Sequence, residues 1–131
     1  MYPLKHILRG NAASCLIFGV VFVLIPGPTV QWLSDHSPAP AALMLTIGIV
    51  LILNGFHLLS TARLANIPRQ LIIYFSTMDI VWVVGTFVLI LSKTWITTQA
   101  GIVAATLVAI MVGLWATLQL LAIRASQPDS H

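Results

Sequence analysis

The chain has 131 residues, of which 59% are hydrophobic and 7% are charged, and it contains no glutamate. Soluble domains are about one quarter charged, so this composition predicts an integral membrane protein and leaves no room for a separate soluble domain. The net charge of +3 is the difference between six basic and three acidic residues. The basic residues stand near helix ends and therefore do not indicate a nucleic-acid partner. A single cysteine excludes an internal disulfide and a multi-cysteine metal site.

Four apolar stretches of spanning length predict an all-α fold, a four-helix transmembrane bundle in a single domain over residues 1–125. We expect the first helix at 4–25 to be retained and to stop at Pro26 and Pro28, because proline cannot continue a helical hydrogen-bond ladder. The segment 27–40 is then predicted to form an ordered outer loop.

The remaining helices are predicted from the other three apolar stretches, and a polar tail is expected at residues 126–131. The helix ranges are 41–59, 71–91 and 100–123.

Orientation follows from the distribution of basic residues between the two sides of the predicted bundle. Lys93 stands alone on one side, and positive charge favours the cytoplasmic side. We therefore expect both termini on the cytoplasmic side of the membrane. The basic residues on the terminal side are Lys5, Arg9, Arg63, Arg69 and Arg124.

The third apolar stretch contains one carboxylate, Asp79. An ionisable side chain at bilayer depth is costly, so Asp79 is expected to face the bundle interior and to have a partner, with His57 the natural one. Two interpretations remain open. The carboxylate either joins helices through hydrogen bonds, or forms a proton-titrating or cation-binding site.

Other polar side chains lie at similar depth, in the inner half of the predicted bundle. Helical projection gives each of the first three helices one polar face. These faces hold Asn11 with Ser14, Cys15, Phe18 and Phe22, then Asn54 with His57 and Thr61, and then Asp79 with Ser76, Trp82 and Thr86. The outer half offers only threonines, so it is expected to be closed and dry. The predicted pocket is lined by Asn11, Asn54, His57, Asp79 and Gln119.

Small residues recur every four positions in the last stretch, at Gly101, Ala105, Ala109 and Gly113. Such a stripe permits a close helix approach, either within the bundle or in a homodimer. The ends of the second and fourth helices also show a weak sequence similarity, in which His57 corresponds to Gln119. Such a similarity is typical of a duplicated two-helix hairpin.

Catalytic and cofactor signatures are missing from the sequence. Haem requires two axial ligands at matched depth, and His57 is the only histidine well inside a predicted helix. Zinc or di-iron sites need more histidines and carboxylates than these helices offer. No serine or cysteine has an adjacent base and acid. We therefore expect no enzyme activity, no metal and no cofactor.

Several short features resemble uncharacterised bacterial four-helix inner-membrane proteins and, loosely, the DoxX-type families. They are the basic start, the proline-bounded loop, an arginine after the second helix, the pair Asp79 and Trp82, and the pair Leu118 and Gln119. The resemblance implies a small bacterial membrane protein without an established catalytic role, and it carries over no functional residue.

These observations favour a small non-enzymatic membrane protein. It would act as an accessory subunit of a larger membrane complex, or as a binder of a lipid or other hydrophobic small molecule in the polar pocket of the cytoplasmic half. The alternative is a small transporter, working as a homodimer, in which Asp79 couples proton movement to a substrate.

Overall fold

The computed structural model describes residues 4–35 and 38–125, and within them all regular structure is helical. Four helices are long and apolar enough to cross a membrane, which confirms the predicted all-α class. The predicted tail at 126–131 lies outside the described residues. The helices are α1 (Leu4–Leu24), α2 (Pro26–Leu33), α3 (Ala41–Ala62), α4 (Arg69–Leu91) and α5 (Gln99–Ala125).

The short helix α2 corrects the prediction of a loop over residues 27–40. Its first residue is Pro26, which only Ile25 separates from the last residue of α1, Leu24. Proline lacks the amide hydrogen that a helix interior needs, but its fixed φ suits the first helical turn, where that hydrogen would have no partner. The prolines therefore end one helix and begin the next.

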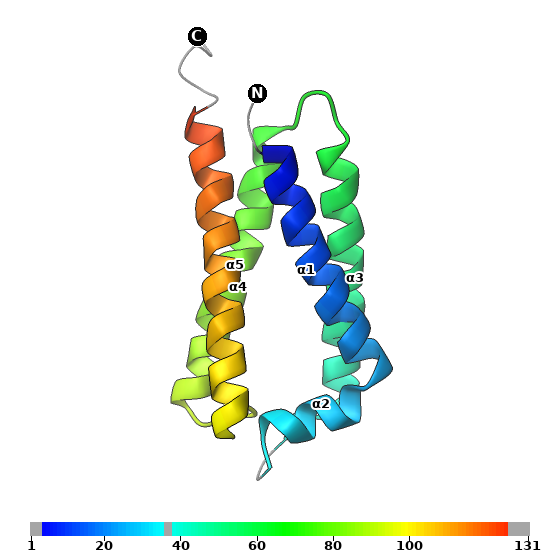
Figure 1. Cartoon of the computed structure of the whole chain (residues 1–131), viewed down its shortest axis with the longest axis vertical. Helices are drawn as coiled ribbons and strands as arrows, with labels where there is room; N and C mark the ends of the chain where they lie inside the picture. Colours follow the sequence, from blue (N-terminus) through cyan, green and yellow to red (C-terminus); the bar gives the residue numbers. More distant parts are fainter. Residues whose placement is uncertain (1–3, 36–37, 126–131) are drawn as a thin grey trace.

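The four long helices pack as two hairpins, α1 with α3 and α4 with α5. Figure 1 shows the chain termini and the α3–α4 connection at one end, and α2 lying across the opposite end. We call these the terminal end and the α2 end. Between the hairpins, α1 approaches α5, whereas the backbones of α3 and α4 do not pack closely against each other.

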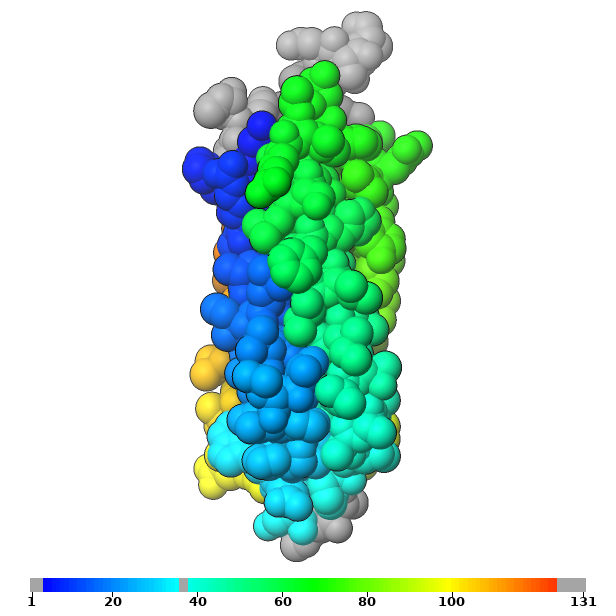
Figure 2. Space-filling view, turned by 90° about the vertical axis from the view of Figure 1, so that its right-hand side faces the viewer, coloured from blue at the N-terminus to red at the C-terminus, as the bar shows by residue number. Residues whose placement is uncertain are grey.

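Glycines set the close approach of α1 to α3. A Cβ atom added at Gly48 would lie 2.9 Å from the carbonyl oxygen of Gly19, and one added at Gly55 would lie 2.7 Å from Leu16 Cγ. The two backbones can touch only because these positions lack side chains. Figure 2 shows the resulting continuous surface of α1 and α3.

The outer surface of the bundle is apolar, as a bilayer requires. Ile17, Leu53, Val84 and Leu107 are each more than half exposed and come from four different helices. In water such a surface would favour aggregation, whereas facing lipid it needs no protein cover. The structure thus agrees with the composition, since four of its helices are long and apolar enough to span a membrane.

Hydrogen bonds tie α2 to the connection between α4 and α5. The backbone nitrogens of Thr97 and Thr98 both donate to the carbonyl oxygen of Leu33, and the hydroxyls of Ser34 and Thr97 lie 2.8 Å apart. Thr98 Oγ1 donates to the Trp32 carbonyl at 2.8 Å and accepts from Gly101 N at 2.9 Å. This joint connects the two hairpins at the α2 end.

We expect Thr98→Val to lower the free energy of unfolding by about 2 kcal/mol, because it removes a helix cap and a bond between the hairpins. Thr117→Val is the matched control, since the Thr117 hydroxyl bonds only to the Gly113 carbonyl of its own helix. Denaturation of the purified chain in mixed detergent micelles measures both. Equal losses in the two variants would show that the joint adds no stability.

Candidate functional site

A buried polar cluster centres on Asp79 in α4. One carboxylate oxygen, Oδ2, accepts a hydrogen bond from Asn11 Nδ2 at 3.0 Å and another from Gln119 Nε2 at 3.3 Å. Asn11 Nδ2 also donates to Gln119 Oε1 at 2.9 Å. Asn11 is 2% exposed and Gln119 is fully buried, so three helices are joined by one closed triangle of polar side chains.

The cluster extends on both sides of the triangle. Gln119 Nε2 donates to Ser76 Oγ at 3.0 Å. On the other side the Cys15 thiol donates to Asn11 Oδ1 at 3.8 Å, and Asn54 Nδ2 donates to Cys15 Sγ at 3.5 Å. All four long helices therefore contribute to one chain of hydrogen bonds, and the structure brings Asn11, Asn54 and Gln119 together around Asp79.

The second carboxylate oxygen of Asp79, Oδ1, makes no hydrogen bond within the described residues. Among the described residues, the only fully buried side-chain nitrogen or oxygen atom without a hydrogen-bond partner is Trp115 Nε1. Because Oδ1 also has no partner but is not among such buried atoms, it is at least partly accessible. Asp79 is 7% exposed, and no lysine or arginine of residues 4–35 and 38–125 bonds to it. The carboxylate thus presents one unused acceptor.

His57 does not join this cluster. Its imidazole is exposed and packs edge-on against the Phe75 ring, with centroids 4.9 Å apart, and near the Tyr74 ring at 6.1 Å. Asp79 instead takes its hydrogen bonds from two neutral amides. His57 still lines the cavity described next, on the side where α3 faces α4.

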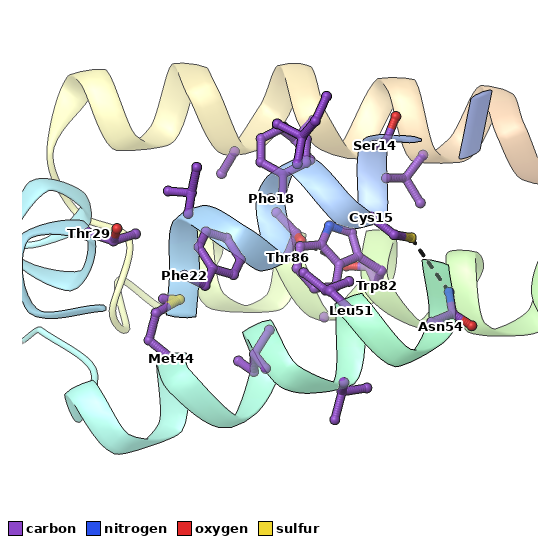
Figure 3. Close-up of a pocket in the computed structure, with 18 of the residues that line it drawn as sticks. Ser14, Cys15, Phe18, Phe22, Thr29, Met44, Leu51, Asn54, Trp82 and Thr86 are labelled. Atoms are coloured by element: carbon purple, nitrogen blue, oxygen red, sulfur yellow. Dashed lines mark hydrogen bonds between the residues drawn. The ribbon is translucent and has the colours of Figure 1, made fainter. Parts of the chain in front are cut away.

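A cavity of about 1060 Å³ adjoins the polar cluster and extends toward the α2 end. Figure 3 shows its length, from Thr29 and Met44 at one end to Cys15 and Asn54 at the other. Nearly all of its wall is apolar. The prediction of a closed outer half was therefore wrong, because the two hairpins diverge there and side chains do not fill the space between them.

The faces predicted by helical projection are the faces that line this cavity. Phe18 and Phe22 of α1 continue the face of Asn11, and Trp82 and Thr86 of α4 continue that of Asp79. From Asn11 to Phe22 the helix rises about 16 Å at 1.5 Å per residue. The cavity is thus a long apolar chamber with hydrogen-bonding groups at its end nearer the termini.

One side of the cavity lies between α3 and α4, where the helix backbones do not pack. Val50 and Leu53 of α3 and Met78 and Val81 of α4 line it there, and all four are exposed. An apolar molecule in the bilayer would meet only hydrocarbon side chains on this side. Within each hairpin the helices pack closely, α1 on α3 and α4 on α5, and α1 also approaches α5, although exposed residues of α1 such as Ile17 line the cavity as well.

The stripe of small residues on α5 meets several different neighbours. Gly101 packs against the Leu33 backbone of α2, and Ala109 is fully buried. Ala105 lines the cavity. A Cβ atom at Gly113 would meet only Val83, at 3.9 Å. The closest helix contact is therefore made by α1 and α3 rather than along this stripe.

Two residues of the site were not predicted as such, Cys15 and Ser76. Both lie on the helical faces that Asn11 and Asp79 define, and that shared face was the available signal. No group of three or more histidine, cysteine or acidic side chains within the described residues could hold a metal ion. The arrangement can accept a hydrogen bond and enclose an apolar body.

Comparison with protein-family models, with curated proteins and with solved structures gives no match to this chain. The fold and the site themselves define the class. It is an all-helical chain with four helices of membrane-spanning character and an apolar cavity that ends at a buried carboxylate.

Proposed function

We propose that this protein is a non-enzymatic membrane protein that binds a lipid or another hydrophobic small molecule in the cavity between its hairpins. The observation that carries the proposal is the cavity itself. Binding sites for drug-sized ligands measure about 300–1,000 Å³, are mostly apolar and contain a few polar groups that fix orientation. The chamber is slightly larger than this range at about 1060 Å³, its wall is mostly apolar, and the Asp79 cluster supplies the polar groups.

The gap between α3 and α4 supports entry from the bilayer. A hydrophobic ligand is concentrated in the hydrocarbon layer, and the exposed lining residues Leu53 and Val81 offer it an apolar path. The protein would lie in a bacterial inner membrane with both termini in the cytoplasm, as the basic residues of the terminal end favour. The Asp79 cluster then lies in the cytoplasmic half, and the apolar chamber reaches into the outer half.

A small proton-coupled transporter is the second candidate. The unused Oδ1 of Asp79 beside the cavity favours it, because a carboxylate that can exchange a proton for a ligand is the minimum that such coupling needs. A homodimer or a larger complex would be compatible with either function. Transport, unlike binding alone, would move a ligand across a sealed vesicle in response to a pH gradient.

The binding function can be tested by filling the cavity at Gly85. This glycine lines the cavity, and a Cβ atom added to it meets nothing within 4 Å. The readout is the rate at which N-ethylmaleimide modifies Cys15, the single cysteine of the chain, which also lines the cavity. The probe is dodecanol, added to the full-length protein in phosphatidylcholine nanodiscs.

We expect dodecanol to slow the modification of Cys15 in the unmodified chain. In Gly85→Leu the mole fraction of dodecanol needed for half-protection should rise about tenfold. The added side chain should exclude about two methylene groups of the probe, and each costs about 0.8 kcal/mol of binding free energy, so two weaken binding about tenfold. Gly113→Leu is the control, since Gly113 is also an uncrowded helical glycine but does not line the cavity.

Two results would contradict the binding function. One is modification of Cys15 at the same rate at every dodecanol concentration. The other is equal weakening of protection by Gly85→Leu and Gly113→Leu, which would mean that dodecanol acts through the bilayer and not in the cavity. An accessory subunit without a ligand would give the first result and would copurify with a protein partner at fixed stoichiometry.

A further inference from the structure

We propose that the ligand of this cavity is a lipophilic amine, that is, an apolar body with a positively charged head that donates hydrogen bonds. The inference rests on the proposed binding function and specifies the chemistry of the ligand. Its basis is the contrast between the two ends of the cavity. The α2 end is apolar, and the opposite end holds the one acidic side chain within the four long helices, Asp79.

The hydrogen bonds of Asp79 leave one position for a donor. Asn11 and Gln119 both donate to Oδ2, and they occupy that oxygen from the α1 and α5 sides. Oδ1 accepts nothing from the described residues, and Asp79 lines the cavity. A ligand hydroxyl or ammonium can fill this position, whereas a ligand carboxylate would bring two acceptors together.

The absence of a positive side chain beside Asp79 among the described residues favours an ammonium head over a hydroxyl head on the ligand. The amides of Asn11 and Gln119 are neutral, and the cavity wall contains no lysine or arginine. A buried carboxylate without an opposite charge is unfavourable in an apolar environment. The titratable groups that line the cavity with Asp79 are Cys15, His57 and Tyr74, and His57 packs against aromatic rings instead of the carboxylate.

Aromatic rings along the cavity wall favour the same charge. Trp82 follows Asp79 by three residues on one face of α4, and its indole lies in the cavity beside Thr86 and Leu51 (Figure 3). Phe18 and Phe22 line the facing wall, with ring centroids 6.4 Å apart. Ring faces attract cations, and the attraction is strongest where water is excluded.

The test compares three probes with the same twelve-carbon chain, dodecylammonium, dodecanol and dodecanoate, at equal mole fractions in phosphatidylcholine nanodiscs. Protection of Cys15 from N-ethylmaleimide is measured on the unmodified full-length chain. We expect dodecylammonium to reach half-protection at a mole fraction at least about tenfold below that of dodecanol, since hydrogen bonds to charged groups are stronger than neutral ones. Dodecanoate should protect least.

Asp79→Asn then tests whether the carboxylate causes the preference. The variant keeps the size of the side chain, so the half-protecting concentrations of dodecylammonium and dodecanol should move to within about threefold of each other, with dodecanol still protecting. Since the preference itself is measured on the unmodified chain, the proposal stays testable if Asp79→Asn fails to fold.

The outcomes separate the inference from the binding function. If no probe protects Cys15, the binding function itself fails. If dodecanol or dodecanoate protects as well as dodecylammonium, the binding function stands and the amine is wrong. A tenfold preference that persists in Asp79→Asn would also overturn the inference, because the carboxylate would then not be its source.

Discussion

Gly48→Ala is expected to lower the free energy of unfolding by about 2 to 3 kcal/mol. The added methyl would lie 2.9 Å from the Gly19 carbonyl oxygen and also 2.9 Å from Phe22 Cβ and Val23 Cγ2. Two of these atoms cannot move without displacing the α1 backbone, and overpacking of this kind costs about 1–3 kcal/mol. Unfolding of the purified chain in mixed detergent micelles measures the change.

The chain provides a control with the opposite expected sign. Gly113→Ala adds the same methyl in the middle of α5, where only Val83 lies within 4 Å, at 3.9 Å. Alanine stabilises a helix interior by about 1 kcal/mol relative to glycine, so this variant should be neutral or more stable. If Gly48→Ala matched Gly113→Ala in stability, α1 and α3 would not be in the close contact described.

The displacement of α1 from α3 should also alter the cavity, because Phe22 lines it and is one of the side chains that the new methyl meets. The glycines of the α1–α3 contact therefore affect both stability and the shape of the chamber. The sequence predicted polar residues of the pocket but not the size of the cavity. Its volume depends on how far apart the hairpins lie, which no local pattern of residues encodes.

The four long helices were predictable because each apolar stretch is close to the length that a bilayer requires. The predicted range 41–59 ends three residues before the observed end of α3 at Ala62, since Ser60 and Thr61 are polar but remain helical. Thr61 stays in the helix by bonding to the His57 carbonyl. Residues 26–33 were misassigned because proline marks both the end and the beginning of a helix.

Within the site, helical periodicity correctly grouped side chains on single helices but could not choose partners between helices. Asn54 and His57 were placed on one face of α3, yet Asn54 bonds to Cys15 while His57 packs against Phe75. The difference arises because α3 approaches α1 closely and α4 only through side chains. Gln119, which corresponds to His57 in the similarity between the two helix ends, is fully buried, whereas His57 is exposed.

The second large expected effect concerns Gln119, which joins three helices. We expect Gln119→Leu to lower the free energy of unfolding by about 2 kcal/mol. It removes the bonds to Asn11, Asp79 and Ser76, and interhelical polar contacts in membranes contribute about 1 kcal/mol or less each. Gln99→Leu is the control, because Gln99 is an exposed glutamine at the start of the same helix.

A double-mutant cycle shows whether the triangle acts as a unit. Asn11→Leu removes the bond to Gln119 as well as the bond to Asp79, so the loss in the double variant should be smaller than the sum of the single losses by about 1 kcal/mol. Once one amide is gone, the other has already lost part of its hydrogen bonding. Additive losses would mean that Asn11 and Gln119 bond to Asp79 independently, and that the cluster does not hold the carboxylate in one orientation toward the cavity.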